Sequence, residues 1–136
     1  MRIAILVNLF PPKQIGGMEI ATYNLADNLA QRGHEVHVIT SQDDSLPKLS
    51  EESSFYIHRV TRPKIRIIGY IPFWIRMCLR IQKIKPNIVH SQSLVCGAPA
   101  WVTKQFLNIP YVVWGMGSDI YLHGKLLSMI SKPILQ

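Results

Sequence analysis

The sequence predicts an α/β fold with a Rossmann-like parallel sheet and helices on both of its faces. Short apolar runs rich in Ile, Leu and Val alternate with longer segments whose apolar residues recur at steps of three and four. The chain has 136 residues, 48% of them hydrophobic, which suits a single domain with a buried core. Because parallel strands connect through right-handed crossovers, this alternating order folds into one sheet.

The N-terminal segment predicts a strand, a helix and a second strand. Residues 2–8 are nearly all apolar, which is typical of a strand covered on both faces of a parallel sheet. Residues 17–32 place their apolar side chains along one helical face, and Gly33 follows where a helix end favours positive φ. Residues 36–39 then form the second strand.

The remaining segments continue this alternation. Residues 42–54 form a polar, turn-rich loop on compositional grounds. Pro72 is tolerated in the first turn of the next helix, and Pro86 ends that helix. Further strands are expected at residues 55–60, 87–90 and 111–114, and helices at 68–84, at 95–107 and from residue 121 onward.

Three loops follow strands at the edge where α/β sheets bind their ligands. They comprise residues 8–17, 90–95 and 115–119, and we expect them to line one cleft. The first loop has no glycine directly after its strand, which disfavours a dinucleotide-binding fingerprint. No Gly-Lys-Ser/Thr follows Gly17 either, which excludes a Walker A loop.

Gly16 and Gly17 stand where the first helix begins. A helix start carries unpaired N–H groups and about half a positive charge, and glycine lets a phosphate approach the backbone closely. The pair therefore predicts an anion site. The alternative is a tight turn from the loop into the helix, which is a common role of glycine.

Positive charge is concentrated in the later part of the chain. Residues 53–136 contain eleven Lys and Arg against one acidic residue, Asp119, and the whole chain has a net charge of +7. Such asymmetry suits nucleic acid, an anionic membrane surface or a phosphorylated substrate. The basic residues are scattered over loops and a helix without an RRM, KH or helix-turn-helix signature, so a nucleic-acid partner is not expected.

The helix expected at residues 68–84 is amphipathic and basic. Arg76, Arg80 and Lys83 fall at i, i+4 and i+7, so they share one face. One interpretation is a solvated basic face, and the other is peripheral contact with an anionic membrane. The segment carries too many charges to cross a membrane.

Cysteine and histidine give no sign of a metal site. Cys78 and Cys96 lack the spacing of metal ligands, and no secretory signal is recognisable before them. We therefore expect reduced thiols in a cytoplasmic protein, either free or peripheral at the inner face of the membrane. The five histidines show no ligand pattern.

Four motifs in order resemble one known family across almost the whole chain. They are PP-x3-GG-x-E, RGHEVHVIT, KPNIVHSQS and YVVWGMGSDIY. Together they resemble the N-terminal domain of glycosyltransferase family 4, the glycogen-synthase-like retaining enzymes of GT-B fold. The resemblance implies transfer of a sugar from a nucleotide-diphosphate sugar to a carbohydrate or lipid-linked acceptor, with retention and without a metal or other cofactor.

The resemblance also implies roles for particular residues. Gly16 and Gly17 would lie against the donor diphosphate, and Asp119 would belong to a loop that contacts the sugars. Met116 stands where the family has a histidine, so only its backbone carbonyl could keep that contact. Each position has a structural alternative, since an acidic residue also favours a helix start and a histidine can be a satisfied core residue. The remaining residues expected at the acceptor or in the cleft are Glu19, His90 and Ser118.

Residues 1–136 are thus expected to be an acceptor-side domain that is incomplete at its C-terminal end. The family's donor-binding half, with its E-x7-E segment, is absent from this sequence. We therefore expect no turnover by the chain alone. The alternatives are an acceptor-binding subunit of a split GT-B enzyme and a non-enzymatic basic module that binds nucleic acid.

Overall fold

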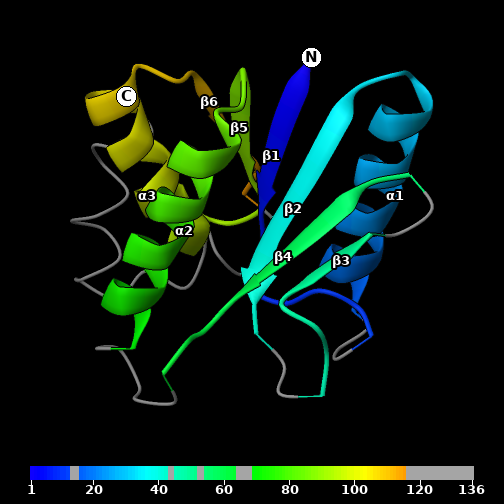
Figure 1. Cartoon of the computed structure of the whole chain (residues 1–136), viewed down its shortest axis with the longest axis horizontal. Helices are drawn as coiled ribbons and strands as arrows, with labels where there is room; N and C mark the ends of the chain where they lie inside the picture. The colour runs from blue at the N-terminus through cyan, green and yellow to red at the C-terminus, as the bar shows by residue number, and fades with distance from the viewer. Residues whose placement is uncertain (13–15, 43–44, 52–53, 64–68, 116–136) are drawn as a thin grey trace.

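The computed structural model describes residues 1–12, 16–42, 45–51, 54–63 and 69–115. Its strands form one six-stranded sheet in the order β3-β4-β2-β1-β5-β6 (Figure 1). The strands are β1 (Arg2–Leu6), β2 (Glu35–Ser41), β3 (Leu49–Glu51), β4 (Tyr56–Val60), β5 (Ile88–Ser91) and β6 (Tyr111–Val113). The helices are α1 (Gly17–Gln31), α2 (Tyr70–Ile84) and α3 (Leu94–Leu107).

The sheet is covered on both faces, as the sequence predicts. Helix α1 packs on one face, and α2 and α3 pack on the other (Figure 1). Strands β1, β2, β4, β5 and β6 pair in parallel, so their carboxyl ends meet at one edge. Alternate residues of β1 serve the two cores: Ile5 packs on the α1 side and Leu6 on the α2 side.

Helix α2 confirms the predicted amphipathic pattern. Its fully buried residues Phe73, Met77 and Ile81 recur every four positions and face the sheet. Lys85 ends the helix in the left-handed conformation at φ 51°, and Pro86 follows it. The start of this helix was expected at residue 68, which lies outside the described residues, as does the helix expected from residue 121.

The expectation of a polar, turn-rich loop over all of residues 42–54 is wrong in one part. Leu49–Glu51 forms β3, which pairs antiparallel with β4 at the edge of the sheet. A segment this short shows no alternating pattern in the sequence. It is held by β4, because the backbone N–H of Arg59 donates to Lys48 O at 2.7 Å and the Arg59 guanidinium donates to Pro47 O at 3.2 Å.

Other boundaries agree with the expected ones within two residues. Helix α3 starts at Leu94, one position early, because the Ser93 hydroxyl accepts a hydrogen bond from Cys96 N and caps the helix. Gly33 has φ 84°, which confirms the predicted positive φ after α1. Apart from β3, the elements of the described residues are therefore the ones predicted from apolar periodicity.

Candidate functional site

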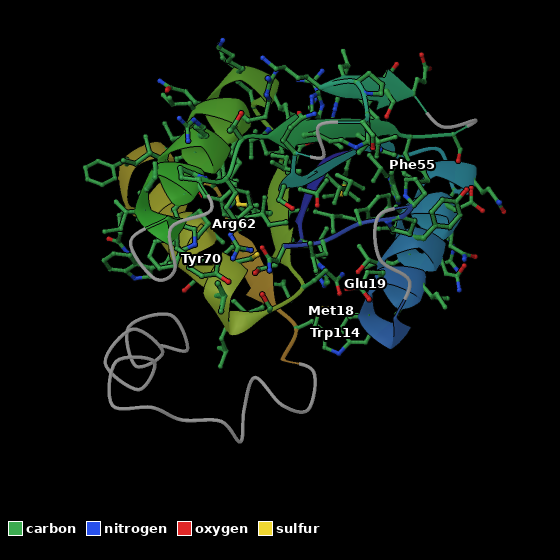
Figure 2. All side chains as sticks on the ribbon, turned by 90° about the horizontal axis from the view of Figure 1, so that it is seen from below. Met18, Glu19, Phe55, Arg62, Tyr70 and Trp114 are labelled. Carbon is green, nitrogen blue, oxygen red and sulfur yellow. The ribbon has the colours of Figure 1, made fainter. Side chains whose placement is uncertain are left out.

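The loops after β1, β5 and β6 meet at the carboxyl edge of the sheet, as predicted for their described residues. Gln92 N donates to Leu6 O at 2.9 Å, and Trp114 N donates to Ser91 O at 2.8 Å. Each loop is thereby fixed to the neighbouring strand. Figure 2 looks onto this edge and labels Glu19, Arg62, Tyr70 and Trp114 around it.

The glycine pair begins α1 at this edge. Gly16 is the N-cap, with an extended backbone at φ −126° and ψ −179°, and its carbonyl accepts from Ile20 N at 3.1 Å. Gly17 is the first helical residue, and a Cβ added there would meet nothing within 4 Å. Neither glycine has a positive φ, so the backbone conformation at both positions is open to other residues.

Glu19 places its carboxylate in front of this helix start. A Cβ added at Gly16 would lie 2.6 Å from Oε2 of Glu19. The position suits a carboxylate, because the unpaired N–H groups and the helix dipole favour negative charge there. An anion bound at the same N–H groups would therefore lie next to Glu19, or displace its flexible side chain.

Arg62, Asn8 and Tyr70 form a contact that the sequence analysis missed. Nη1 of Arg62 donates to Oδ1 of Asn8 at 2.9 Å, and the guanidinium carbon lies 4.3 Å from the centroid of the Tyr70 ring. Arg62 is half-buried just after β4, and Asn8 is half-buried after β1. The sequence does show that Asn8 and Arg62 are polar residues that come shortly after a strand. It does not show that they contact each other, because they are far apart along the chain.

His90 is held at the end of β5 by its neighbours. Its Nδ1 lies 3.1 Å from Nε2 of Gln92, and its ring packs edge-on against Trp114 at a centroid distance of 6.2 Å. Burial lowers the pKa of His90, which favours the neutral imidazole. His90 is therefore a neutral side chain held in a fixed position beside the carboxyl edge of the sheet.

A row of hydrogen-bonded titratable side chains, Glu35, His37 and His58, lies along β2 and β4 on the α2 face of the sheet. Nε2 of His37 is 3.0 Å from Oε1 of Glu35, and Nδ1 of His37 is 2.9 Å from Nε2 of His58. A hydrogen bond from His37, followed by one from Arg2, lowers the pKa of Glu35. Burial, followed by the charges of His37 and Arg80, lowers the pKa of His58 to about 4.

The proton positions along this row of side chains follow from hydrogen-bond chemistry. Nε2 of His37 must carry the proton that faces the carboxylate of Glu35, so Nδ1 of a neutral His37 is an acceptor. His58 then donates from Nε2, which leaves its Nδ1 with a lone pair. That buried nitrogen has no hydrogen-bond partner among the described residues.

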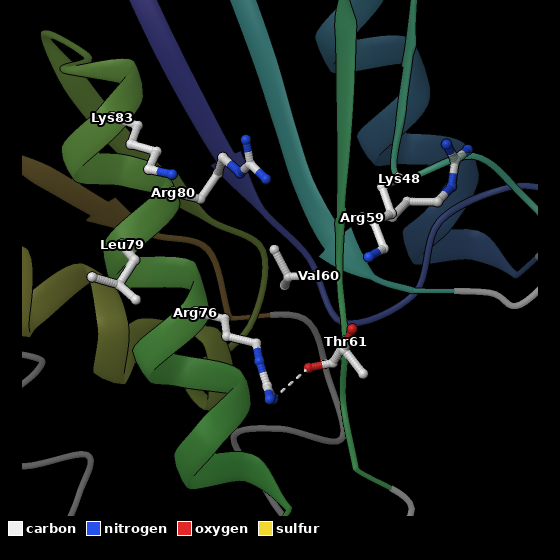
Figure 3. Close-up of a pocket in the computed structure, with 8 residues that line it drawn as sticks. All are labelled: Lys48, Arg59, Val60, Thr61, Arg76, Leu79, Arg80 and Lys83. Atoms are coloured by element: carbon white, nitrogen blue, oxygen red, sulfur yellow. Dashed lines mark hydrogen bonds between the residues drawn. The ribbon is translucent and has the colours of Figure 1, made fainter.

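Arg76, Arg80 and Lys83 lie on one side of α2, as the spacing predicts. They line a recess together with residues of β4 and with Lys48, which precedes β3 (Figure 3). The recess is on the α2 face of the sheet, whereas the glycine pair opens α1 on the opposite face (Figure 1). The basic residues and the glycine pair are therefore separate features.

Three of the predicted site residues cannot be placed. Met116, Ser118 and Asp119 lie outside the described residues. Among the residues that are described, no group of three or more His, Cys, Asp and Glu side chains could hold a metal ion. No helix in the described ranges has the length and apolar character needed to cross a membrane.

Comparison with known sequences assigns the family. The sequence profile of Glycosyltransferase Family 4 matches residues 15–132, so the chain belongs to this glycosyltransferase family. It is 29% identical to an uncharacterised glycosyltransferase, MJ1607, of Methanocaldococcus jannaschii over 98% of the chain and 35% of that protein. It is 28% identical to the N-acetyl-α-D-glucosaminyl L-malate synthase of Bacillus anthracis over 92% of the chain and 34% of that protein.

Solved structures of similar fold are glycosyltransferases as well. Sucrose-phosphate synthase from Thermosynechococcus elongatus superposes with a TM-score of 0.78 at 19% identity, over 98% of this chain and 40% of that one. HepE of Anabaena, solved with UDP and glucose, superposes with a TM-score of 0.65 at 12% identity, over 98% and 35%. The architecture is thus one half of a GT-B fold, and the chain spans about a third of the length of its curated relatives.

Proposed function

We propose that this chain is the acceptor-side domain of a retaining glycosyltransferase that moves a sugar from a nucleotide diphosphate to a carbohydrate or lipid-linked acceptor. The glycine pair at the start of α1 carries the proposal. Gly16 and Gly17 adopt backbone conformations open to any residue. A Cβ at Gly17 would meet nothing within 4 Å, and a Cβ at Gly16 would approach only the flexible carboxylate of Glu19, so the backbone itself does not require glycine at either position. Close approach of a ligand to the main chain is a physical reason for two residues without side chains.

The donor diphosphate is the ligand proposed for this position. The helix start offers N–H donors and positive charge to an anion at the carboxyl edge of the sheet. HepE, which shares the fold, was solved with UDP and glucose, which supports a nucleotide donor. The helix start supplies charge that a metal ion would otherwise provide, so the proposal includes no metal cofactor.

The acceptor is proposed to lie beside Arg62, Tyr70 and Trp114 at the same edge. Arg62 is oriented by Asn8 and by the Tyr70 ring, which leaves further N–H donors for a ligand. The names of two relatives include L-malate and sucrose phosphate, which fits an anionic acceptor in this family. Asp119, Ser118 and the backbone carbonyl of Met116 are proposed to complete the cleft, with Glu19 and His90 at its margins.

The second wall of the donor site is proposed to come from a donor-binding half. That half is either a further part of the same protein or a partner subunit of a split enzyme. The chain matches 35% and 34% of the length of its curated relatives, which leaves room for a second domain of that kind. The chain alone is proposed to be inactive.

A nucleotide-release assay tests this proposal. The chain is assayed with a panel of UDP- and GDP-sugars, alone and combined with a donor-binding half from a relative. We expect release from the combination and none from the chain. Substitution of both glycines, Gly16→Ala and Gly17→Ala, should lower release about tenfold or more, because added side chains hold the diphosphate away from the helix start.

Two outcomes would contradict the proposal. Transfer by the isolated chain would show that no second half is needed. An unchanged rate in the double glycine variant would remove the diphosphate from this position. Circular dichroism serves as the control for folding, because the backbone at both positions accepts alanine and the Gly16→Ala side chain displaces only the flexible carboxylate of Glu19.

Peripheral contact with an anionic membrane is proposed for the outer surface of α2. Ile71, Ile75 and Leu79 are more than half exposed at 56%, 54% and 53% and recur every four positions. These apolar side chains form a row along α2 next to its basic side chains, an arrangement typical of helices that lie on membranes. Co-sedimentation with anionic but not with neutral liposomes would support the contact, and equal recovery on both would end it.

A further inference from the structure

A recess on the α2 face of the sheet is lined mainly by basic residues and lies apart from the carboxyl edge loops. Its volume is about 240 Å³, below the range of about 300–1,000 Å³ that is typical of pockets for drug-sized ligands. No acidic residue belongs to its described lining. The lining residues are Lys48, Arg59, Val60, Thr61, Arg76, Leu79, Arg80 and Lys83 (Figure 3).

Two of the arginines are held by backbone carbonyls. Nη1 of Arg76 donates to Thr61 O at 3.0 Å, which ties α2 to the end of β4 (Figure 3). Arg59 is 5% exposed, and its guanidinium donates to Pro47 O, which ties β4 to the segment before β3. These contacts fix the two walls of the recess and leave the other cations to meet a ligand.

Among the described residues, no partner neutralises the charges of Lys48, Arg80 and Lys83. Within the described ranges, none of these three side chains forms a hydrogen bond or an ion pair. Arg76 and Arg80 are four positions apart and Arg80 and Lys83 are three apart, spacings at which like charges repel on a helix. The positive charge of Arg80 also helps to keep the neighbouring His58 neutral. An anion in the recess would relieve this repulsion.

We propose that this recess binds one phosphate group, carried by a small soluble ligand or by a phospholipid headgroup. Arginine donates parallel hydrogen bonds to phosphate oxygens, and lysine adds a mobile point charge. The recess is concave and short, which suits one phosphate better than the extended backbone of a nucleic acid. Because α1 and α2 cover opposite faces of the sheet, this phosphate is distinct from the donor diphosphate proposed at Gly16 (Figure 1).

The test is a titration of the full chain with inorganic phosphate at constant ionic strength, followed by NMR of isotope-labelled protein. We expect saturable shifts at the amides of α2 and β4. The variant Arg80→Gln/Lys83→Gln should raise the dissociation constant about tenfold or more. The matched control is Arg32→Gln/Lys104→Gln, which removes the same charges from exposed positions at the C-terminal ends of α1 and α3 and should change binding less than twofold.

Vesicles distinguish the two sources of the phosphate. Phosphatidylcholine vesicles with and without phosphatidylglycerol are added to the chain, with free phosphate as competitor. If the chain binds phosphate, and if free phosphate also displaces it from anionic vesicles, the ligand is a phospholipid headgroup. If the chain binds phosphate but no vesicles, the ligand is a small soluble phosphate compound. The proposal is overturned if phosphate does not saturate, if both variants lose affinity equally, or if anionic vesicles bind while free phosphate does not.

Discussion

The side chains of Arg62 and Asn8 are joined by a hydrogen bond of 2.9 Å, although the residues are 54 positions apart. Asn8 follows β1 and Arg62 follows β4, and β2 lies between these strands in the sheet. The contact therefore spans the carboxyl edge across three strands. Tyr70, the first residue of α2, completes it with its ring 4.3 Å from the guanidinium carbon. The loops of this edge are thus held in place before any ligand binds.

Substitution of Asn8 should loosen this edge. Asn8→Ala removes the neutral acceptor of Arg62, and we expect a loss of about 1 kcal/mol in the free energy of unfolding. Urea unfolding followed by circular dichroism measures the loss. Asn24→Ala, at an exposed position of α1, is the control and should change stability by less than about 0.5 kcal/mol. An equal loss in the free energy of unfolding for both substitutions would show that the hydrogen bond of Asn8 does not stabilise the fold.

Substitution of Phe73 should have the largest effect on stability. The side chain is fully buried between α2 and the sheet, so Phe73→Ala should cost about 3–5 kcal/mol through lost contacts and a cavity. Ile75→Ala on the outer face of the same helix, where Ile75 is 54% exposed, should cost less than about 1 kcal/mol. Thermal unfolding of both variants decides whether α2 packs in this orientation.

Acidification should destabilise the chain through His58. Its pKa is about 4 when folded, below the usual value of about 6.5 that applies when unfolded. The unfolded chain therefore takes up the proton first, and stability that is complete above pH 6.5 falls as the pH approaches 4. Since neighbouring solvent screens part of the effect, we expect a loss of about 1–2 kcal/mol.

A substitution isolates this contribution. His58→Gln should flatten the decline in the free energy of unfolding between pH 6.5 and 4. His34→Gln, in the segment before β2, is the matched control for the loss of an imidazole. The carboxylate of Glu35 adds to the decline only at the acid end of this range, because its pKa is lowered and its contribution is lost below the usual value of 4.5. An identical slope in both variants would contradict the assignment.

The thiols should react slowly in the folded chain. Burial raises the pKa of Cys78 to about 11, and Cys96 is fully buried. At pH 8 we expect labelling of Cys78 by a thiol reagent to be about a hundredfold slower than that of a free thiol. Labelling in urea provides the control, where both thiols should react fully. Rapid labelling of the folded chain would show that α2 opens away from α3.

The sequence by itself determined the elements that depend on local pattern. Apolar periodicity predicted the parallel strands and all three helices of the described ranges, and the glycine after α1 was predicted with its positive φ. The spacing of Arg76, Arg80 and Lys83 predicted their shared side of α2. These features follow from residues close in the chain, whose geometry is fixed by the helix or strand that contains them.

Only the tertiary structure decided which distant residues meet. Strand β3 exists because β4 pairs with it. The partners of Arg62 come from the loop after β1 and from α2. The basic recess likewise needs Lys48, which precedes β3 and is far in the sequence from the residues of α2 that line the same recess. No local pattern encodes these contacts, because they depend on the order of strands in the sheet and on the packing of helices against it.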